Sequence, residues 1–166
     1  MGGVVIAAPA SASGKTLITL GLLRAFSRQG IRVSSLKVGP DYIDPQFHHK
    51  ASGRPCGNLD IWAMRPETFL RQVTQAQTDA ELIIAEGVMG LFDGARSGDG
   101  STANVAAKLD WPVILVVDVR GQAASAAAVV EGFANHRKDV RIGGVIFNRV
   151  GSDQHAAILN DAMAGS

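Results

Sequence analysis

The chain has a single cysteine, Cys56, among its 166 residues. One cysteine excludes an internal disulfide and leaves no second thiol for a zinc pair, which fits a reducing compartment. We expect Cys56 to be an unreactive loop thiol, because no pattern around it suggests a nucleophile.

An excess of charge of one sign is also missing, as is any long basic run. The formal net charge is +1, with 16 Lys and Arg against 15 Asp and Glu. This balance argues against nucleic-acid or anionic-membrane binding through bulk charge. No basic segment leads into an apolar one at the N-terminus, and Ile6 stands where a myristoylation signal needs Ser or Thr. We therefore expect a cytoplasmic protein whose partners are small molecules, with no nucleic acid and no membrane.

The residues that are present predict one α/β domain over 1–166. Apolar residues make up 46% of the chain, which is enough to bury a core at this length. Short β-branched runs alternate with stretches of helical spacing. Because the runs are nearly continuous in Val, Ile and Leu, they indicate a doubly wound, mainly parallel sheet with helices on both faces. The expected strands are 4–7, 32–36, 82–85, 113–117 and 145–147, and the expected helices are 15–29, 67–76, 102–109, 123–134 and 153–163.

A small-residue loop, A-P-A-S-A-S-G-K-T at 8–16, joins the first strand to the first helix. Phosphate binding needs backbone N–H groups at a helix N-terminus, a lysine and a hydroxyl for Mg²⁺, which Gly14, Lys15 and Thr16 supply. The usual G-x-x-x-x-G-K-[ST] pattern asks for glycine where this chain has Pro9, so a polar turn with a solvated lysine is the alternative. The remaining residues expected to contact the nucleotide are Ser11, Ala12, Ser13 and Leu17.

Two connections, 38–64 and 87–101, are long for this fold and begin at carboxyl ends of strands, where open α/β sheets bind ligands. The first opens with Lys37 at a strand end and with Asp41 and Asp44 in a Pro-bounded turn. One or two carboxylates beside phosphate oxygens suit Mg²⁺, although Asp and Pro also form turns for local reasons. Beside a phosphate loop, we favour the functional interpretation.

Further polar residues end the later strands. Glu86 follows the strand 82–85 and is our leading magnesium ligand, in the manner of a Walker B carboxylate. Asp118 also ends a strand and competes for that role. Asp93 lies in a glycine-flanked loop and is either a site residue or a turn residue. Asn148 is placed to meet an adenine edge, with a structural cap as the alternative.

The other residues that stand out receive structural interpretations. His48 and His49 are adjacent, and no carboxylate–histidine pattern marks a metal site, so we expect loop residues. Trp62 and Phe69 are expected to pack at the start of a helix.

Several separate motifs, spread over essentially the whole chain, resemble the N-terminal ATP-binding domain of the cobyrinic acid a,c-diamide synthase family. The wider group includes dethiobiotin synthetase and cobyric acid synthase. The motifs are K-V-G-P-D-Y-I-D-P at 37–45, F-H at 47–48, N-L-D at 58–60, E-G-V-M-G-L-F-D-G at 86–94, D-V-R-G-Q-A-A-S-A-A-A at 118–128 and N-R-V at 148–150.

The resemblance implies a P-loop fold and an ATP-dependent amidation of the a and c acetate groups of a corrin precursor in cobalamin biosynthesis. Glutamine would be the nitrogen source. A carboxylate is a poor electrophile, so the γ-phosphoryl group would first convert it to an acyl phosphate that ammonia displaces. Whether the corrin contains cobalt, and whether ATP or CTP is preferred, stays open.

The same resemblance implies roles for individual residues. The loop amides hold the phosphates, and Asp93 helps to place the carboxylate or the metal. The expected catalytic residues are Lys15, Lys37, Asp41, Asp44 and Asp93, with Lys37 neutralising the transferring phosphoryl group; the expected ligands of Mg²⁺ are Thr16, Glu86 and Asp44, or Asp41 in its place.

One departure from the family is large, because its members carry a C-terminal glutaminase domain that these residues do not provide. We expect a fragment of a longer protein that cannot use glutamine alone, and the wider group adds a homodimer as an expectation. Besides another amidoligase such as cobyric acid synthase, the alternatives are a bare nucleotide-binding module and a ParA-like or MinD-like nucleotide switch. Such switches carry an extra lysine near the start of the loop, where this chain has Ala8, Pro9, Ala10 and Ser11.

Overall fold

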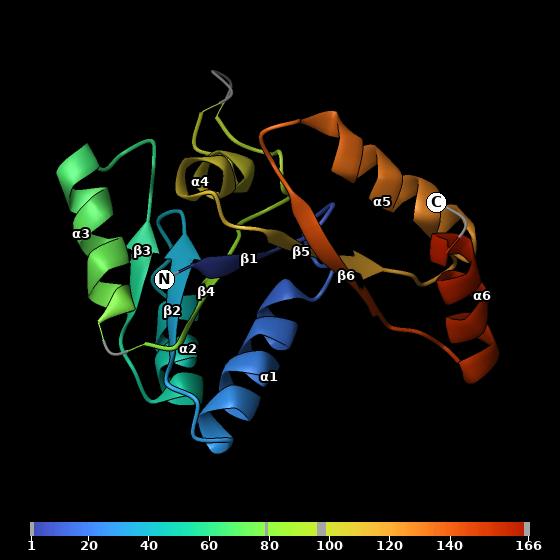
Figure 1. The fold of residues 1–166 in the computed structure, drawn as a ribbon, viewed down its shortest axis with the longest axis horizontal. Coiled ribbons are helices and arrows are strands. Elements are labelled where there is room, and N and C mark those ends of the chain that lie inside the picture. Colours follow the sequence, from blue (N-terminus) through green and yellow to red (C-terminus); the bar gives the residue numbers. More distant parts are fainter. Residues whose placement is uncertain (1, 79, 96–98, 165–166) are drawn as a thin grey trace.

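The computed structural model describes residues 2–78, 80–95 and 99–164. Strands and helices alternate along this part of the chain (Figure 1). The strands are β1 (Gly3–Ala7), β2 (Val33–Val38), β3 (Cys56–Leu59), β4 (Leu82–Glu86), β5 (Val113–Asp118) and β6 (Ile142–Asn148). The helices are α1 (Lys15–Arg28), α2 (Asp44–Ser52), α3 (Pro66–Gln77), α4 (Thr102–Leu109), α5 (Ser125–His136) and α6 (Asp153–Ala164).

The strands form one sheet in the order β3-β2-β4-β1-β5-β6. Every pairing in it is parallel, so the carboxyl ends of all its strands lie at the same edge. The chain starts at β1 in the middle of the sheet, and β2 and β3 lie on one side of it. It then returns through β4, which lies between β2 and β1, and adds β5 and β6 on the other side. This confirms the predicted doubly wound α/β fold with a parallel sheet.

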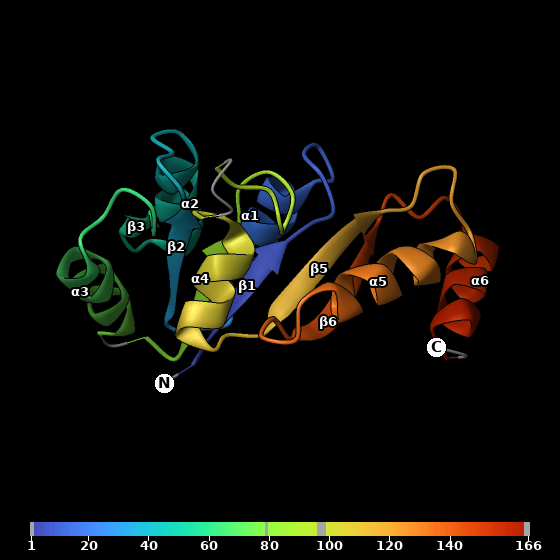
Figure 2. The same cartoon turned by 90° about the horizontal axis from the view of Figure 1, so that it is seen from above.

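Helices cover both faces of the sheet (Figure 2). Helices α1 and α2 pack on one face, where Leu23 and Val33 are buried in the smaller apolar cluster. Helices α3, α4 and α5 cover the other face, over a larger cluster that contains Phe69, Val105 and Val130. A parallel sheet covered in this way needs strands that are apolar on both faces, which is the pattern read from the sequence.

The first long connection is more ordered than we expected, because 38–64 contains both α2 and β3. The loop prediction for His48 and His49 is therefore wrong, since both lie on α2. Cys56 begins β3 instead of lying in a loop. Trp62 is exposed, which contradicts its expected packing role, whereas Phe69 is buried in α3.

The register of the sheet brings the expected site residues to one edge. Glu86 at the end of β4 lies opposite Lys37 of β2 on one side and opposite Ile6 of β1 on the other. The chain leaves β1 at this same edge and forms the loop before α1. No helix of the described residues is long and apolar enough to cross a membrane.

Candidate functional site

The loop between β1 and α1 is built around Gly14, which lies just before the helix with a left-handed φ of 95°. A Cβ added to Gly14 would stand 2.2 Å from Nδ2 of Asn148, which itself donates a hydrogen bond to the Ser13 carbonyl oxygen at 2.9 Å. Ser13 Oγ donates to the Ala10 carbonyl oxygen at 2.9 Å and closes the loop. Among the described residues, no side chain caps the start of α1. Its first N–H groups and positive dipole end are therefore available to an anion.

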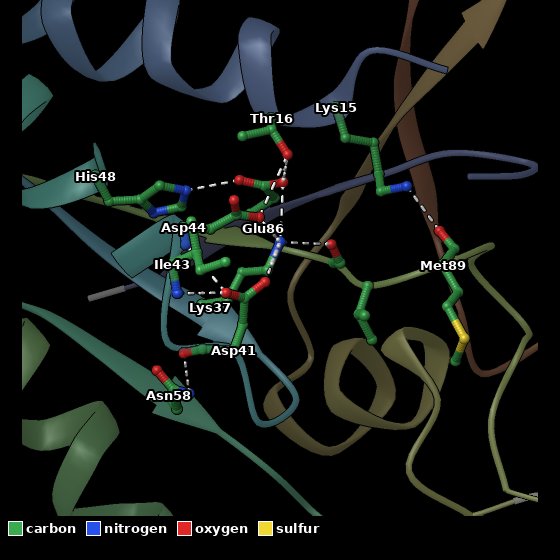
Figure 3. A network of polar contacts seen from close by, with 12 residues as sticks. Lys15, Thr16, Lys37, Asp41, Ile43, Asp44, His48, Asn58, Glu86 and Met89 are labelled. Atoms are coloured by element: carbon green, nitrogen blue, oxygen red, sulfur yellow. Dashed lines mark hydrogen bonds and ion pairs between the residues drawn. The ribbon is translucent and has the colours of Figure 1, made fainter. Parts of the chain in front are cut away.

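Lys15 is the first residue of α1, and its side chain reaches across the loop toward the segment after β4 (Figure 3). Its Nζ donates to the Met89 carbonyl oxygen at 2.7 Å. Met89 has a φ of 50°, a left-handed conformation that is uncommon outside glycine. Burial lowers the pKa of Lys15, and the nearby charge of Glu86 offsets only part of that effect.

Glu86 is the centre of the polar network and has no exposed surface (Figure 3). Its Oε1 accepts hydrogen bonds from Thr16 Oγ1 at 2.5 Å and from Lys37 Nζ at 3.0 Å. Its Oε2 lies 2.6 Å from Nε2 of His48. Burial alone would raise the pKa of Glu86, but the bond from His48 and the charge of Lys37 outweigh it and lower that pKa.

The ammonium of Lys37 lies between the carboxylates of Glu86 in β4 and Asp44 in α2. Its Nζ lies 2.6 Å from Oδ2 of Asp44 and 3.9 Å from Oδ2 of Asp41, in addition to its contact with Glu86. Burial alone would lower the pKa of Lys37, but Glu86 and Asp44 outweigh it and raise that pKa. Asp41 has a second role, because its Oδ1 accepts from the N–H groups of Ile43 at 2.8 Å and Asp44 at 3.0 Å and so fixes the start of α2.

Oxygen atoms suited to a magnesium ion converge at this point. Thr16 Oγ1 lies 2.5 Å from Glu86 Oε1 and 3.4 Å from Asp44 Oδ2. Among the described residues, no group of three or more His, Cys, Asp and Glu side chains is arranged to hold a metal alone. Two carboxylates and a hydroxyl fit Mg²⁺, which takes few protein ligands and completes its shell with water and phosphate oxygens. The residues therefore fit a cation that arrives with a nucleotide.

His48 is the site residue that our reading of the sequence missed. It lies on α2 with no exposed surface, between Glu86 and Cys56, whose Sγ is 3.5 Å from His48 Nδ1. Burial alone would lower the pKa of His48, but its contacts with Cys56 and Glu86 outweigh burial and raise it to about 9. The sequence did contain a signal for α2, because a proline near the start and a glycine just after the end are typical helix boundaries. Here these residues are Pro45 and Gly53, which has a φ of 75°.

Asp118, the competitor of Glu86 at a strand end, has other partners. Its Oδ2 accepts from Arg120 Nη2 at 2.8 Å and from Arg149 Nη1. The hydrogen bonds from these two arginines lower the pKa of Asp118 to about 2. The hydroxyl of Thr16 bonds Glu86 instead, so the geometry favours Glu86 as the carboxylate that faces this hydroxyl.

The remaining predicted residues lie around this centre in different ways. Asp93 accepts from the Gly90 N–H at 2.9 Å and closes its own turn, although its charge is close enough to oppose part of the lowering that burial imposes on the pKa of Lys15. Leu17 is 75% exposed in the first turn of α1, and Ser11 and Ala12 are exposed in the loop. Contacts of these residues with a nucleotide stay predictions.

A hollow of about 690 Å³ lies on the outer side of the loop. It is lined by Ser11 and Ser13 of the loop and by Asp118, Arg120 and Gln122 after β5. The loop therefore has open space on the side of β5.

Comparison with known proteins identifies relatives along the whole chain. The family model of the CobQ/CobB/MinD/ParA nucleotide-binding domain matches residues 4–166. The chain is 56% identical over 165 residues to hydrogenobyrinate a,c-diamide synthase of Rhizobium meliloti, which covers 99% of this chain and 38% of that protein. The synthase of Brucella anthropi is 56% identical over 98% of this chain, and that of Agrobacterium fabrum is 48% identical over 96%. These relatives confirm the resemblance that the motifs indicate.

A solved structure is similar in fold alone. Chloroplast FtsY from Physcomitrella patens matches 97% of this chain and 52% of its own with a TM-score of 0.57 and 16% sequence identity. The chain spans 38% of the length of the curated synthases named first. With a family model matched over nearly all of its residues and a small-residue loop at the carboxyl edge of a parallel sheet, the chain belongs to the CobQ/CobB/MinD/ParA nucleotide-binding domain family.

Proposed function

We propose that this chain is the ATP-binding synthetase part of an enzyme that amidates the a and c carboxylates of a corrin precursor in cobalamin biosynthesis. The observation that carries the proposal is the 56% identity to a hydrogenobyrinate a,c-diamide synthase over 99% of the chain. That name makes cobalt-free hydrogenobyrinic acid the first substrate to test, before cobyrinic acid.

The chemistry requires that a carboxylate become an electrophile. In the proposed reaction a substrate carboxylate oxygen attacks the γ-phosphorus of ATP, which gives an acyl phosphate and ADP. Ammonia then attacks the acyl carbon, phosphate leaves, and a proton is lost, which gives the amide. Bound Mg²⁺ would neutralise phosphate charge, and the protein would contribute position and electrostatic stabilisation.

The roles we assign use the contacts of the network. Lys15, whose Nζ is held by the Met89 carbonyl oxygen, would bind the outer phosphates together with the N–H groups at the start of α1. Thr16, Glu86 and Asp44 would hold Mg²⁺. Lys37, buried between carboxylates, would neutralise the transferring phosphoryl group.

Three predicted residues have less direct support. Asp41 fixes the start of α2 and would act on the site through Asp44, which follows it in the same turn. Asp93 would help to place the substrate or the metal. Asn148 supports the loop through Ser13, and a contact with adenine is an additional proposal for it.

A nucleotide switch of the ParA or MinD type belongs to the same broad family, so the family model alone does not separate it from a synthetase. The curated relatives at 48% to 56% identity carry the synthase name, and this favours the amidating ligase. We therefore do not propose the switch as a second function.

The remaining 62% of the curated relatives' length is the natural place for the glutaminase that would supply ammonia. We propose that this chain works with such a domain, in the cytoplasm, and that a homodimer is its assembled form.

The test is calorimetric titration of Mg·ATP into the chain, followed by an assay for ADP with hydrogenobyrinic acid and an ammonium salt. We expect binding by the wild type and corrin-dependent ADP, with the acyl phosphate trapped by hydroxylamine. Lys15→Ala should abolish binding, whereas Lys50→Ala, a control at an exposed lysine of α2, should not.

Two results would contradict the proposal in different ways. If the wild type does not bind Mg·ATP, the proposed phosphate site is wrong. If it binds Mg·ATP normally but forms no corrin-dependent ADP with either the cobalt-free or the cobalt-containing acid, the proposed amidation is wrong and the chain is a nucleotide-binding module.

A further inference from the structure

The two oxygens of the Glu86 carboxylate have different surroundings. Oε1 faces the loop before α1 and the neighbouring strand β2, where Thr16 Oγ1 donates to it at 2.5 Å and Lys37 Nζ at 3.0 Å. Oε2 faces α2, where His48 Nε2 lies 2.6 Å away. Because an ionised carboxylate only accepts hydrogen bonds, Nε2 of His48 carries the proton in this contact. Each oxygen therefore has a partner from a different helix.

The difference between the two oxygens matters because the carboxylate of a glutamate rotates easily about its last side-chain bond and has two nearly equivalent orientations. A carboxylate bonded through one oxygen can rotate and exchange its two oxygens, or turn both away from a ligand. A fixed donor on Oε2 removes this freedom. Both side chains are fully buried, so water does not substitute for the missing partner at low cost.

The position of His48 is itself fixed by its helix. Asp44 and His48 are four residues apart on α2, so they lie on the same face of the helix. Asp44 reaches the site through Lys37, at 2.6 Å from its Nζ, while His48 contacts Glu86 directly. On its other side, the ring is held by Cys56 of β3, whose Sγ is 3.5 Å from Nδ1. Figure 3 shows the ring of His48 directed at Glu86 from this helix.

We propose that His48 is a positioning residue, which by donating from Nε2 to Glu86 Oε2 presents Oε1 toward Thr16 and the magnesium ion of the nucleotide. This inference rests on the proposed role of Glu86 as a ligand of that ion. It assigns to α2 a function that Asp44, the acidic residue of its first turn, does not supply.

The test uses the Mg²⁺ dependence of ATP affinity, measured by calorimetry on this chain in MgCl₂ and in EDTA. His48→Asn keeps a polar side chain that is too short to reach Oε2, and His48→Met fills the volume without a donor. His48→Gln carries an amide N–H at the position of Nε2 and should rescue. Exposed His49 on the same helix offers the matched control, His49→Asn.

We expect His48→Asn and His48→Met to lose about 10-fold or more of the affinity gained from Mg²⁺, as loss of an outer partner of a metal ligand commonly does. Affinity for ATP in EDTA should stay within about 3-fold of wild type. His48→Gln and His49→Asn should keep the gain. A merely structural role would weaken ATP binding in both buffers and would not be rescued by Gln.

Each contrary result overturns a defined statement. If His48→Asn and His48→Met keep the Mg²⁺-dependent gain, His48 does not position the ligand, and the proposed function is unaffected. If the wild type itself gains nothing from Mg²⁺, the inference falls together with the metal role of Glu86. If neither variant folds, His48 belongs to the stability of the fold and the inference is overturned. Failure of corrin-dependent ADP formation with a normal Mg²⁺ gain would leave it standing.

Discussion

Gly14 occupies a position that combines an unusual backbone conformation with a close neighbour. Its φ is 95°, and an added Cβ would lie 2.2 Å from Asn148 Nδ2. Asn148 belongs to β6 and Gly14 to the loop after β1. Because they are far apart in the sequence, no local pattern predicts their contact. The glycine of the motif is therefore fixed by packing as well as by any anion.

We predict that Gly14→Ala lowers the free energy of unfolding by about 1–2 kcal/mol, the usual cost of a left-handed conformation for a residue with a Cβ. It should also weaken ATP binding by about 10-fold or more, because the loop must move to accommodate Asn148. Gly21→Ala is the control, since Gly21 is exposed within α1 and has nothing within 4 Å of the new methyl group. That change should raise stability by about 0.5–1 kcal/mol in urea unfolding.

A second prediction concerns pH and His48. Its pKa is about 9 in the folded protein against an ordinary value of 6.5. Because the folded state then binds more protons between these values, the stability contributed by His48 is complete below pH 6.5 and is lost as pH rises to about 9. Urea unfolding of the metal-free protein should show this decline, and His48→Gln should reduce its slope. Parallel pH curves for the two proteins would contradict the assigned charge of His48.

At the scale of elements, adjacent residues of α3 provide a test of the core. Phe69 is 1% exposed in the larger apolar cluster, whereas its neighbour Leu70 is 56% exposed. We predict that Phe69→Ala lowers the free energy of unfolding by about 3–5 kcal/mol, because it removes buried contacts and leaves a cavity. Leu70→Ala should change it by about 0.5 kcal/mol or less. Equal effects in chemical unfolding would mean that α3 does not pack as described.

The elements were predictable where apolar periodicity was strong. Val113–Asp118 and Thr102–Leu109 match the expected ranges to within a residue, because buried strands and amphipathic helices leave a regular pattern. Helix α2 does not, since its nine residues have little apolar character and only Pro45, His48 and Ser52 are buried. Pro45 and Gly53 mark its boundaries in the sequence, but Asp41 and Asp44 beside them were interpreted as residues of a functional loop. The short edge strand β3 has a glycine and an asparagine, which are poor strand formers.

Most residues of the candidate site were predictable from the sequence, but His48 and the contacts within the site were not. Glu86, Thr16 and Lys37 follow from motif and strand-end position, because parallel strands deliver their ends to one edge. The bond between His48 and Glu86 joins residues 38 positions apart and depends on how α2 packs, which no local pattern records. The partners of Asp118 were equally hidden, since Arg149 lies 31 positions away.

At the scale of the whole molecule, the site joins elements from the centre and one half of the sheet. Thr16 lies after β1 at the start of α1, Lys37 is the residue before the last of β2, and Glu86 ends β4, so a ligand that binds all of them stabilises their association. We predict that Mg·ATP at 100 times its dissociation constant raises the free energy of unfolding by about 2.7 kcal/mol. Differential scanning calorimetry should show this as a higher midpoint of one transition. Lys15→Ala should remove the shift, and an unchanged midpoint in the wild type would exclude binding to the native state.

Lys37 is a positive charge of the protein itself that lies among the carboxylates of the candidate site. At neutral pH the ammonium of Lys37 and the imidazolium of His48 balance the carboxylates of Asp44 and Glu86, so these four groups together carry no net charge before any ligand arrives. The protein should consequently fold and remain folded in a chelator, unlike proteins whose metal is needed to cancel buried acidic charge. Loading of Mg·ATP would then be an exchange of partners, in which the incoming cation takes over the carboxylates while the lysine follows the phosphate.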